Sequence, residues 1–138
     1  DDYYTLPFGK ASLVREGEQV TIVTYGMGVH WALETLDENP EIAADLIDLR
    51  TLVPLDTETI FNSVKKTNRV IILHEATMFN GIGGELSALI TENCFEYLDA
   101  PIKRVASLDT PVPFIGELEQ NFMPKERFKT ALKTLVDF

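Results

Sequence analysis

The stretch from Arg69 to Asn93 constrains the fold of this chain more than any other. Residues 70–74 read VIILH, and this length and β-branched content predict a strand buried on both faces of a parallel sheet. A glycine-rich loop follows, and apolar residues then recur at helical spacing, at Ile82, Leu86, Leu89 and Ile90. A buried strand, a glycine-rich turn and an amphipathic helix form half of a βαβ unit. Because open α/β sheets bind ligands at the carboxyl ends of their strands, His74 and Glu75 are the first candidates for chemistry.

The rest of the chain alternates strand and helix patterns. Apolar runs predict strands at residues 20–25, 44–49 and 102–107. Helical patterns cover about 29–36, 57–66, 82–97 and 124–136, with Asp56 as an N-cap and Pro124 as a first helical residue. Residues 109–113 must be extended or in a turn. Residues 1–17 are expected to form a lead-in loop. Whether residues 8–14 contain an additional strand stays open. The alternation predicts one α/β domain over 1–138, a three-layer α/β/α arrangement around a mostly parallel open sheet of about five strands.

The charge balance narrows the classes of partner. The formal net charge is −10, which argues against nucleic acid and anionic membrane and leaves a basic protein partner open. No apolar stretch approaches the roughly 20 residues that a bilayer span needs. Cys94 is the only cysteine, so a disulfide framework is excluded and a cytoplasmic location is expected.

Two glycine-containing turns could bind a nucleotide or phosphate. Gly26-x-Gly28 begins like a dinucleotide fingerprint, but Trp31 stands where the third glycine belongs, which favours a plain tight turn. The loop of residues 80–84 could present backbone N–H groups to an anion at a helix N-terminus. Glu85 puts a negative charge there, so close packing of the glycines against the sheet or another subunit is the favoured interpretation.

No self-sufficient catalytic, cofactor-binding or metal-binding set is visible. His74 and Glu75 are adjacent on a strand end, so their side chains point to opposite faces. Metal-ligand spacings of His and Cys are absent, and Cys94 fits a buried helix cysteine. Trp31 lies off the apolar stripe of its helix, and either the lead-in segment or another subunit must cover it.

A set of motifs in a fixed order then suggests a family. In chain order they are Pro7-Phe-Gly-Lys-Ala11, Val20-x-Ile-Val-x-Tyr-Gly26, Ile47-Asp-Leu-Arg-Thr51 with Pro54-x-Asp56, Val70-x-x-x-His-Glu-Ala76, Gly81-x-Gly-Gly-Glu85, Ala100-Pro-Ile-x-Arg104 and Asp109-Thr-Pro-x-Pro113. Together they resemble the C-terminal domain of the transketolase-like superfamily. The match covers nearly the whole chain and is similar to the beta subunit of the thiamine-diphosphate-dependent decarboxylase component of 2-oxo acid dehydrogenases. The stretch from Cys94 to Pro101 leans toward the branched-chain (2-oxoisovalerate) type over the pyruvate type.

The resemblance implies a parent enzyme that decarboxylates a 2-oxo acid on thiamine diphosphate and acylates a lipoyl group. In that family the diphosphate, its Mg²⁺ and most catalytic groups come from the alpha subunit and the N-terminal, pyrimidine-binding domain of the beta subunit. Residues 1–17 would then lead in from that absent domain, and the isolated chain would be inactive and bind no cofactor. The implied role is assembly with alpha and beta subunits, for which the interface candidates are Trp31, His74, Glu75, Gly81, Gly83 and Gly84.

The resemblance also implies a docking role. In some members an acidic residue before an Ala-Pro pair, here Asp99, and the terminal carboxylate, here on Phe138, receive basic side chains. Those side chains belong to the peripheral subunit-binding domain of the dihydrolipoyl acyltransferase. Adjacent carboxylates would form a local negative site that pairs with Lys and Arg. Two other functions stay open: the matching domain of a transketolase or deoxyxylulose-phosphate synthase, and a free-standing nucleotide-binding module.

Overall fold

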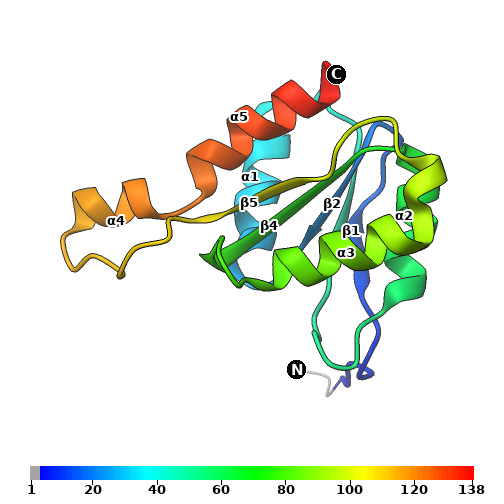
Figure 1. Cartoon of the computed structure of the whole chain (residues 1–138), viewed down its shortest axis with the longest axis horizontal. Coiled ribbons are helices and arrows are strands. Elements are labelled where there is room, and N and C mark those ends of the chain that lie inside the picture. Colours follow the sequence, from blue (N-terminus) through cyan, green and yellow to red (C-terminus); the bar gives the residue numbers. More distant parts are fainter. Residues whose placement is uncertain (1–3) are drawn as a thin grey trace.

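The computed structural model describes residues 4–138 and contains one five-stranded sheet with the strand order β1-β3-β2-β4-β5 (Figure 1). The first three residues of the predicted 1–17 segment lie outside the described part. In chain order the elements are β1 (Ser12–Arg15), β2 (Val20–Thr24), α1 (Met27–Glu38), β3 (Ala44–Asp48), α2 (Thr57–Thr67), β4 (Val70–Thr77), α3 (Ile82–Cys94), a 3₁₀ turn (Phe95–Tyr97), β5 (Lys103–Ser107), α4 (Gly116–Phe122) and α5 (Lys125–Val136).

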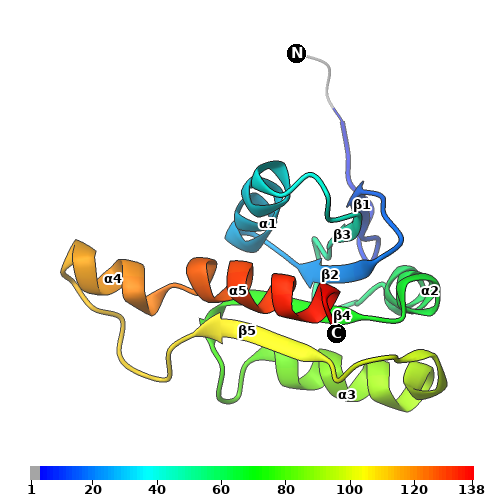
Figure 2. The same ribbon diagram turned by 90° about the horizontal axis from the view of Figure 1, so that it is seen from above.

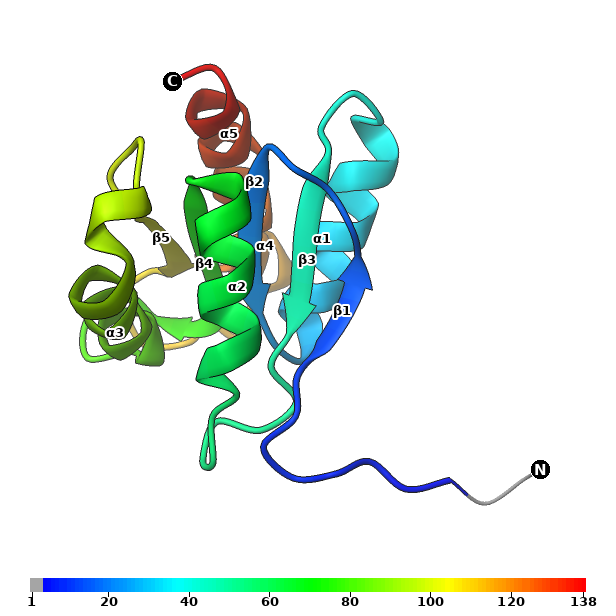
Figure 3. The same ribbon diagram turned by 90° about the vertical axis from the view of Figure 1, so that its right-hand side faces the viewer.

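The sheet is mostly parallel, as predicted. β2 pairs with β3 and with β4, and β4 pairs with β5, all in parallel, while β1 runs antiparallel to β3 at one edge. Helices α1 and α5 cover one face and α2 and α3 cover the other, which gives the predicted α/β/α layers (Figures 2 and 3). The central strands are therefore apolar along most of their length, because both of their faces are buried.

Two apolar cores lie on either side of the sheet. On one face Ile22 and Leu73 meet Leu36 of α1 and Phe128 of α5. On the other face the clustered residues are Val23, Ile47, Leu49, Ile60, Val64, Val70, Ile72, Leu86, Ile90 and Cys94. Successive residues of each strand point to opposite faces and so contribute to the two cores in turn. The packing of the helices on both faces therefore depends on the register of the strands.

Several element boundaries differ from the sequence predictions. The lead-in is partly ordered as β1, near the strand that the sequence left open, because its backbone pairs with β3. β4 continues three residues beyond His74, and its register against β5 shifts between His74 and Thr77. The prediction of Pro124 as the first helical residue was wrong by one position, since Pro124 is the N-cap of α5. Helix α4 was not predicted, because Leu118 is exposed and only Phe122, at its end, is buried, so no periodic core-facing stripe marks the helix.

A buried carboxylate ties the lead-in to α2 at the amino edge of the sheet, which is the edge where the parallel strands begin. Asp45 is 1% exposed, and its Oδ1 accepts from the Gly17 N–H at 2.9 Å and from Lys66 Nζ at 2.7 Å. Its Oδ2 accepts from Ser63 Oγ at 2.7 Å. Both oxygens of the buried charge thus have partners, which is the condition under which such a group is tolerated.

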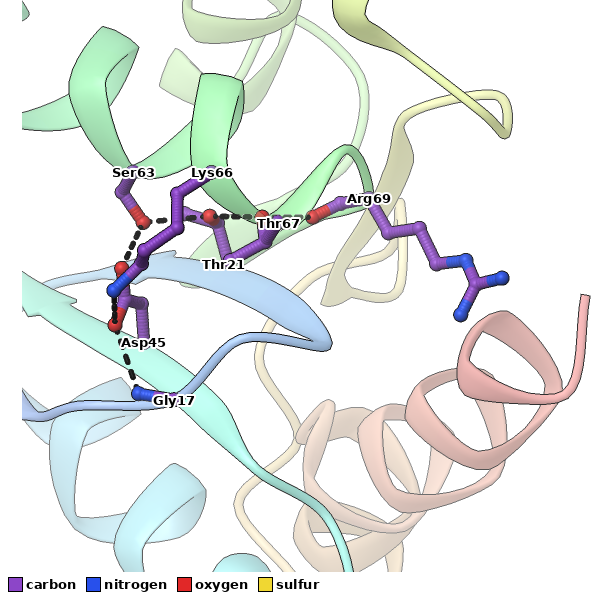
Figure 4. A network of polar contacts seen from close by, with 7 residues as sticks. All are labelled: Gly17, Thr21, Asp45, Ser63, Lys66, Thr67 and Arg69. Carbon is purple, nitrogen blue, oxygen red and sulfur yellow. Dashed lines mark hydrogen bonds and ion pairs between the residues drawn. The ribbon is translucent and has the colours of Figure 1, made fainter.

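The same network continues through hydroxyl groups to the start of β4 (Figure 4). Ser63 Oγ lies 2.6 Å from Thr21 Oγ1, which lies 2.7 Å from Thr67 Oγ1. Thr67 Oγ1 in turn donates to the Arg69 carbonyl at 3.2 Å. This chain of contacts fixes the end of α2 and the entry into β4 relative to β2 and β3.

The two partners in the Asp45–Lys66 ion pair are expected to differ in their effect on stability. Asp45→Ala should lower the free energy of unfolding by about 3 kcal/mol, because it leaves the Gly17 N–H without its acceptor and removes both the Ser63 hydrogen bond and the ion pair with Lys66. Lys66→Ala should cost less, about 1–2 kcal/mol, since the Asp45 side chain is only 2% exposed and loses this cation, while the Gly17 N–H and the Ser63 hydroxyl still donate to its oxygens. Urea unfolding of both variants tests this difference, and equal losses would contradict it.

Candidate functional site

His74 lies at the carboxyl edge of the sheet, where the strands end, and is buried with 1% of its surface exposed. Its Nδ1 lies 3.1 Å from the Ala76 carbonyl, so Nδ1 carries the proton and donates. Its Nε2 is buried without a partner among the described residues. Burial lowers the pKa of His74, and this outweighs the Ala76 hydrogen bond, while nearby Arg104 lowers the pKa further. The ring is therefore neutral near pH 7.

Two glycines of the following loop leave room for this imidazole. A Cβ on Gly81 would lie 2.6 Å from His74 Cε1, and one on Gly83 would lie 2.7 Å from His74 Nε2. A Cβ on Gly84 would meet only Arg104, at an ordinary 3.6 Å. Close packing of the glycines against the sheet or another subunit was the favoured interpretation of the loop, and for Gly81 and Gly83 the contacts with His74 agree with packing on the sheet.

Glu75 and the Gly26-x-Gly28 turn were the other residues predicted at the carboxyl edge. Glu75 is exposed while His74 is buried, as expected for adjacent strand positions. Burial raises the pKa of Tyr25, and the Glu75 carboxylate raises it further. Gly26 has a φ of +57°, and a Cβ on Gly28 would lie 2.0 Å from Thr24 Oγ1. The Gly26-x-Gly28 turn is thus a tight βα connection that brings α1 close to β2.

Among the described residues, Trp31 finds its neighbours in the C-terminal part of the chain. It is half-buried against the core on the α1–α5 face and lines a shallow groove with Gln120, Met123 and Lys125. Coverage of its exposed part by the lead-in segment or by another subunit stays a prediction. Cys94 is buried on α3, as predicted, and burial raises the pKa of its thiol.

The C-terminus lies at the amino edge of the sheet, near the connection from α3 to β5 in which Asp99 stands (Figures 1 and 2). Helices that follow parallel strands run back to this edge, so α2, the 3₁₀ turn after α3, and α5 all end there. The Asp99 N–H donates to the Asn68 carbonyl at 2.9 Å, and Arg69 Nη1 donates to the Val136 carbonyl at 3.1 Å. Both predicted docking residues are exposed, and within residues 4–138 no basic side chain forms an ion pair with either.

Sequence reasoning missed the residues that bring these segments together. Asn68 ends α2 with a φ of +61°, and its Nδ2 donates to the Tyr97 carbonyl at 2.6 Å. Asn at a helix end is a recognisable signal for this left-handed cap. No sequence signal indicates that Asn68 and Arg69 contact segments that are 29 and 67 positions away.

The part of the chain that the structure describes offers no obvious metal site or membrane-spanning element. Among residues 4–138 no group of three or more His, Cys, Asp or Glu side chains is arranged to hold a metal ion. None of the described helices is both long and apolar enough to cross a bilayer. What the structure presents instead are exposed surfaces.

Comparison with known proteins identifies the family. Residues 9–127 match the family model "Transketolase, C-terminal domain". The chain belongs to this family. It is similar to the beta subunit of 2-oxoisovalerate dehydrogenase from Pseudomonas aeruginosa, with 50% identity over 85% of the chain and 33% of the relative. It is also similar to the beta subunit of the pyruvate dehydrogenase E1 component from Rickettsia felis, with 46% identity over 88% of the chain and 38% of the relative.

A solved structure gives the same answer for the fold of this transketolase C-terminal domain. The structure of a split-gene transketolase, described as an inactive beta4 tetramer, superposes with a TM-score of 0.80 over 97% of the chain and 43% of that protein, at 24% identity. The chain spans about 33% to 43% of the length of these relatives. The relatives thus contain a large part that this chain does not match.

The buried His74 is expected to make stability depend on pH. Its folded pKa lies below the ordinary value of 6.5, so the unfolded chain binds more protons as the pH falls below about 6.5. His74 therefore favours the folded state above that pH, and this contribution is lost as the pH falls toward the folded pKa. Urea unfolding between pH 7.5 and 5.5 should show the loss, and His74→Asn should reduce it.

The exposed His30 provides the matched control. His30→Gln should keep the wild-type pH dependence, since His30 lies on the outer surface of α1. An identical pH dependence in wild type and His74→Asn would contradict the assignment to His74.

Proposed function

We propose that this chain is the C-terminal part of the beta subunit, or its fused equivalent, in a 2-oxo acid dehydrogenase decarboxylase component. The parent enzyme decarboxylates a 2-oxo acid on thiamine diphosphate and passes the acyl group to a lipoyl group. Support comes from the family match and from relatives named as pyruvate and 2-oxoisovalerate dehydrogenase beta subunits. We favour a branched-chain 2-oxo acid as the substrate, on the stretch from Cys94 to Pro101. The 24% identity to a transketolase supports a shared fold only.

Within the parent enzyme this domain serves assembly and docking, and the chemistry is carried by other parts. Its described residues do not fit a diphosphate and Mg²⁺: no cluster of metal-binding side chains is present among them, and the Gly81–Gly84 loop is packed against His74. None of these residues is therefore assigned a step of the decarboxylation. The contacts of Gly81 and Gly83 with His74 give these glycines a packing role that needs no nucleotide.

The observation that supports the docking role is the exposure of acidic positions at the amino edge. Asp99 and Phe138 are both exposed. Two consecutive residues contact the segments that carry them: Asn68 binds the backbone of Asp99, and Arg69 binds the last turn of α5. Asp137 is exposed beside Phe138 and adds to the negative charge. Such a cluster attracts Lys and Arg side chains and speeds association. The proposed partner is the peripheral subunit-binding domain of the dihydrolipoyl acyltransferase.

The assembly role is supported by an apolar arm, residues 108–123, that projects from the end of β5 (Figure 1). Four of its large apolar side chains are more than half exposed: Val112, Phe114, Ile115 and Leu118. Phe114 is fully exposed at 102%. Exposed apolar side chains gathered in this way mark an interaction surface. We assign the arm to contacts with another subunit of the parent enzyme.

Hydrogen bonds and burial hold the two ends of the arm in place against the domain. Phe122 is buried, and its carbonyl accepts from the Leu108 N–H at 3.2 Å. The Arg127 guanidinium donates to the carbonyls of Asn121, Phe122 and Ala106 at 2.8, 2.9 and 2.9 Å. A rigid base lowers the entropy that binding would otherwise cost.

Docking predicts salt-sensitive binding. Calorimetry of this chain against the peripheral subunit-binding domain from the same organism should show binding at low salt that weakens at high salt. Asp99→Ala and a carboxamide in place of the carboxylate on Phe138 should each weaken it roughly ten-fold, the scale of one lost charge-assisted contact. Glu119→Ala, which removes an exposed carboxylate on the distant arm, is the matched control and should leave the affinity unchanged. Absence of binding at any salt would count against docking by this domain.

Assembly predicts that the arm matters to the oligomer and little to the fold. Phe114→Ser combined with Ile115→Ser should dissociate the full-length enzyme into smaller species on size-exclusion chromatography with light scattering. The same change in the isolated 138-residue chain should alter the free energy of unfolding by less than about 0.5 kcal/mol, because both side chains are exposed. An intact oligomer with both substitutions would refute the role of the arm.

The division of labour predicts that the chain alone is inactive. With thiamine diphosphate, Mg²⁺ and either pyruvate or 2-oxoisovalerate, the purified chain should release no CO₂ above a heat-denatured control. Turnover by the purified chain would show that the domain carries chemistry of its own.

A further inference from the structure

We propose that Asn80 is a site of spontaneous backbone modification, at which the side-chain amide is lost and an aspartate or isoaspartate residue is formed. The nucleophile is the backbone nitrogen of Gly81, the next residue in the loop between β4 and α3 (Figure 1). Water is the only co-reactant. The site is independent of the docking and assembly roles proposed above, because the reaction takes place between two adjacent residues of this chain.

The reaction follows the chemistry of an asparagine side chain beside a glycine. The Gly81 nitrogen, after losing its proton, attacks the side-chain carbonyl carbon of Asn80, a C–N bond forms, and ammonia leaves, which gives a cyclic imide. Water then opens the imide at either of its carbonyl carbons. Opening at one of them leaves aspartate in a normal backbone. Opening at the other leaves isoaspartate, in which the main chain runs through the former side chain.

Asn80 is exposed, so the water that opens the imide has direct access to it. Its φ of +58° lies in the left-handed region, which few residues other than glycine and asparagine adopt. The side-chain hydrogen bonds of this loop are made by its neighbours. The Phe79 N–H donates to Asp109 Oδ1 at 2.7 Å, and the Phe79 carbonyl accepts from Thr77 Oγ1 at 3.3 Å.

Gly81 provides an accessible nucleophile. It has no Cβ, so no side chain of its own shields the nitrogen from the side chain of Asn80. Its N–H donates to the Met78 carbonyl at 3.4 Å, which is long for a backbone hydrogen bond. Little hydrogen-bond energy is therefore lost when this nitrogen gives up its proton.

The start of α3 favours the negative charge that develops during the reaction. Gly81 is the N-cap of α3, and no side-chain hydrogen bond caps this helix. The positive end of the helix therefore stabilises the deprotonated nitrogen and the oxygen of the tetrahedral intermediate. Glu85 in the first turn weakens this effect, whereas the Arg104 guanidinium strengthens it, since a Cβ on Gly84 would lie 3.6 Å from its Nη1.

Other asparagines of the chain lack one or more of these features. Asn68 has a similar left-handed backbone, with a φ of +61°, but its Nδ2 donates to the Tyr97 carbonyl at 2.6 Å. Asn62 is exposed and precedes a small residue, but it lies inside α2, where the backbone N–H groups are hydrogen-bonded. Asn80 is the only asparagine in the sequence that precedes a glycine.

The two products should differ in their effect on the fold. Aspartate keeps the backbone length and places a carboxylate beside the positive end of α3, where it is favourable. Isoaspartate inserts an extra methylene group into the main chain directly before Gly81. This residue is closely packed, because a Cβ on it would lie 2.4 Å from the Thr77 carbonyl oxygen and 2.6 Å from His74 Cε1. The lengthened backbone therefore displaces Gly81 from the imidazole and exposes His74.

The test is to incubate the purified 138-residue chain in mildly alkaline buffer and to follow its peptides by mass spectrometry. The peptide with Asn80 should gain the mass of an amide-to-acid change roughly ten-fold faster than the peptides with Asn62 or Asn68, because its barrier is lower. An isoaspartyl methyltransferase should label the same peptide. Asn80→Gly, which keeps the left-handed backbone and lacks the amide, is the matched control and should show neither change.

The variant Asn80→Asp separates the effect of the new charge from that of the extra methylene group. It should keep the urea midpoint of the unmodified chain, whereas the isoaspartate form, isolated by reversed-phase chromatography, should unfold at lower urea. The isoaspartate form should also react faster with diethyl pyrocarbonate at His74, whose Nε2 is buried in the unmodified chain.

Each part of the inference can fail separately. Loss of the amide at Asn80 no faster than at Asn62 or Asn68 would overturn the modification site. An isoaspartate form with the same urea midpoint and the same His74 reactivity as Asn80→Asp would overturn the proposed effect on the loop.

Discussion

The buried carboxylate of Asp45 is the constraint on which the amino edge of this domain depends. A charge that is 1% exposed must have its oxygens paired, and here its partners come from the lead-in, from Ser63 and from Lys66. The hydroxyl groups of Thr21 and Thr67 extend the same set of contacts to the start of β4. This polar network links α2 to the sheet with a directional specificity that apolar packing alone lacks.

The carboxyl edge is organised around a different buried group. His74 occupies the place where related sheets often bind ligands, and the glycines of the next loop close over its ring. At this edge the packing of Gly81 and Gly83 on His74 therefore stabilises the domain. The contrast between the two edges explains how a fold that often carries catalysis is used here, in our proposal, for its outer surfaces.

These surfaces lie far apart on the molecule. The apolar arm extends from the carboxyl end of β5, while Asp99 and Phe138 lie at the amino edge (Figure 1). One domain can thus contact a subunit through apolar side chains and a separate basic partner through carboxylates. The chemistry of each surface suits its proposed task, since apolar burial provides durable assembly and exposed charge provides fast, reversible docking.

The sequence by itself determined the layer architecture and most elements, because the buried strands are mostly apolar and the helices show periodic apolar faces. It also favoured close packing of the glycine loop, which the contacts of Gly81 and Gly83 with His74 show within this chain. Only the tertiary structure decided the neighbours of Trp31, the outward-facing α4 and the joining of Asp99 to α5 through Asn68 and Arg69. Local periodicity reports which face of an element is buried, whereas a contact between distant segments depends on how the whole sheet brings their ends together.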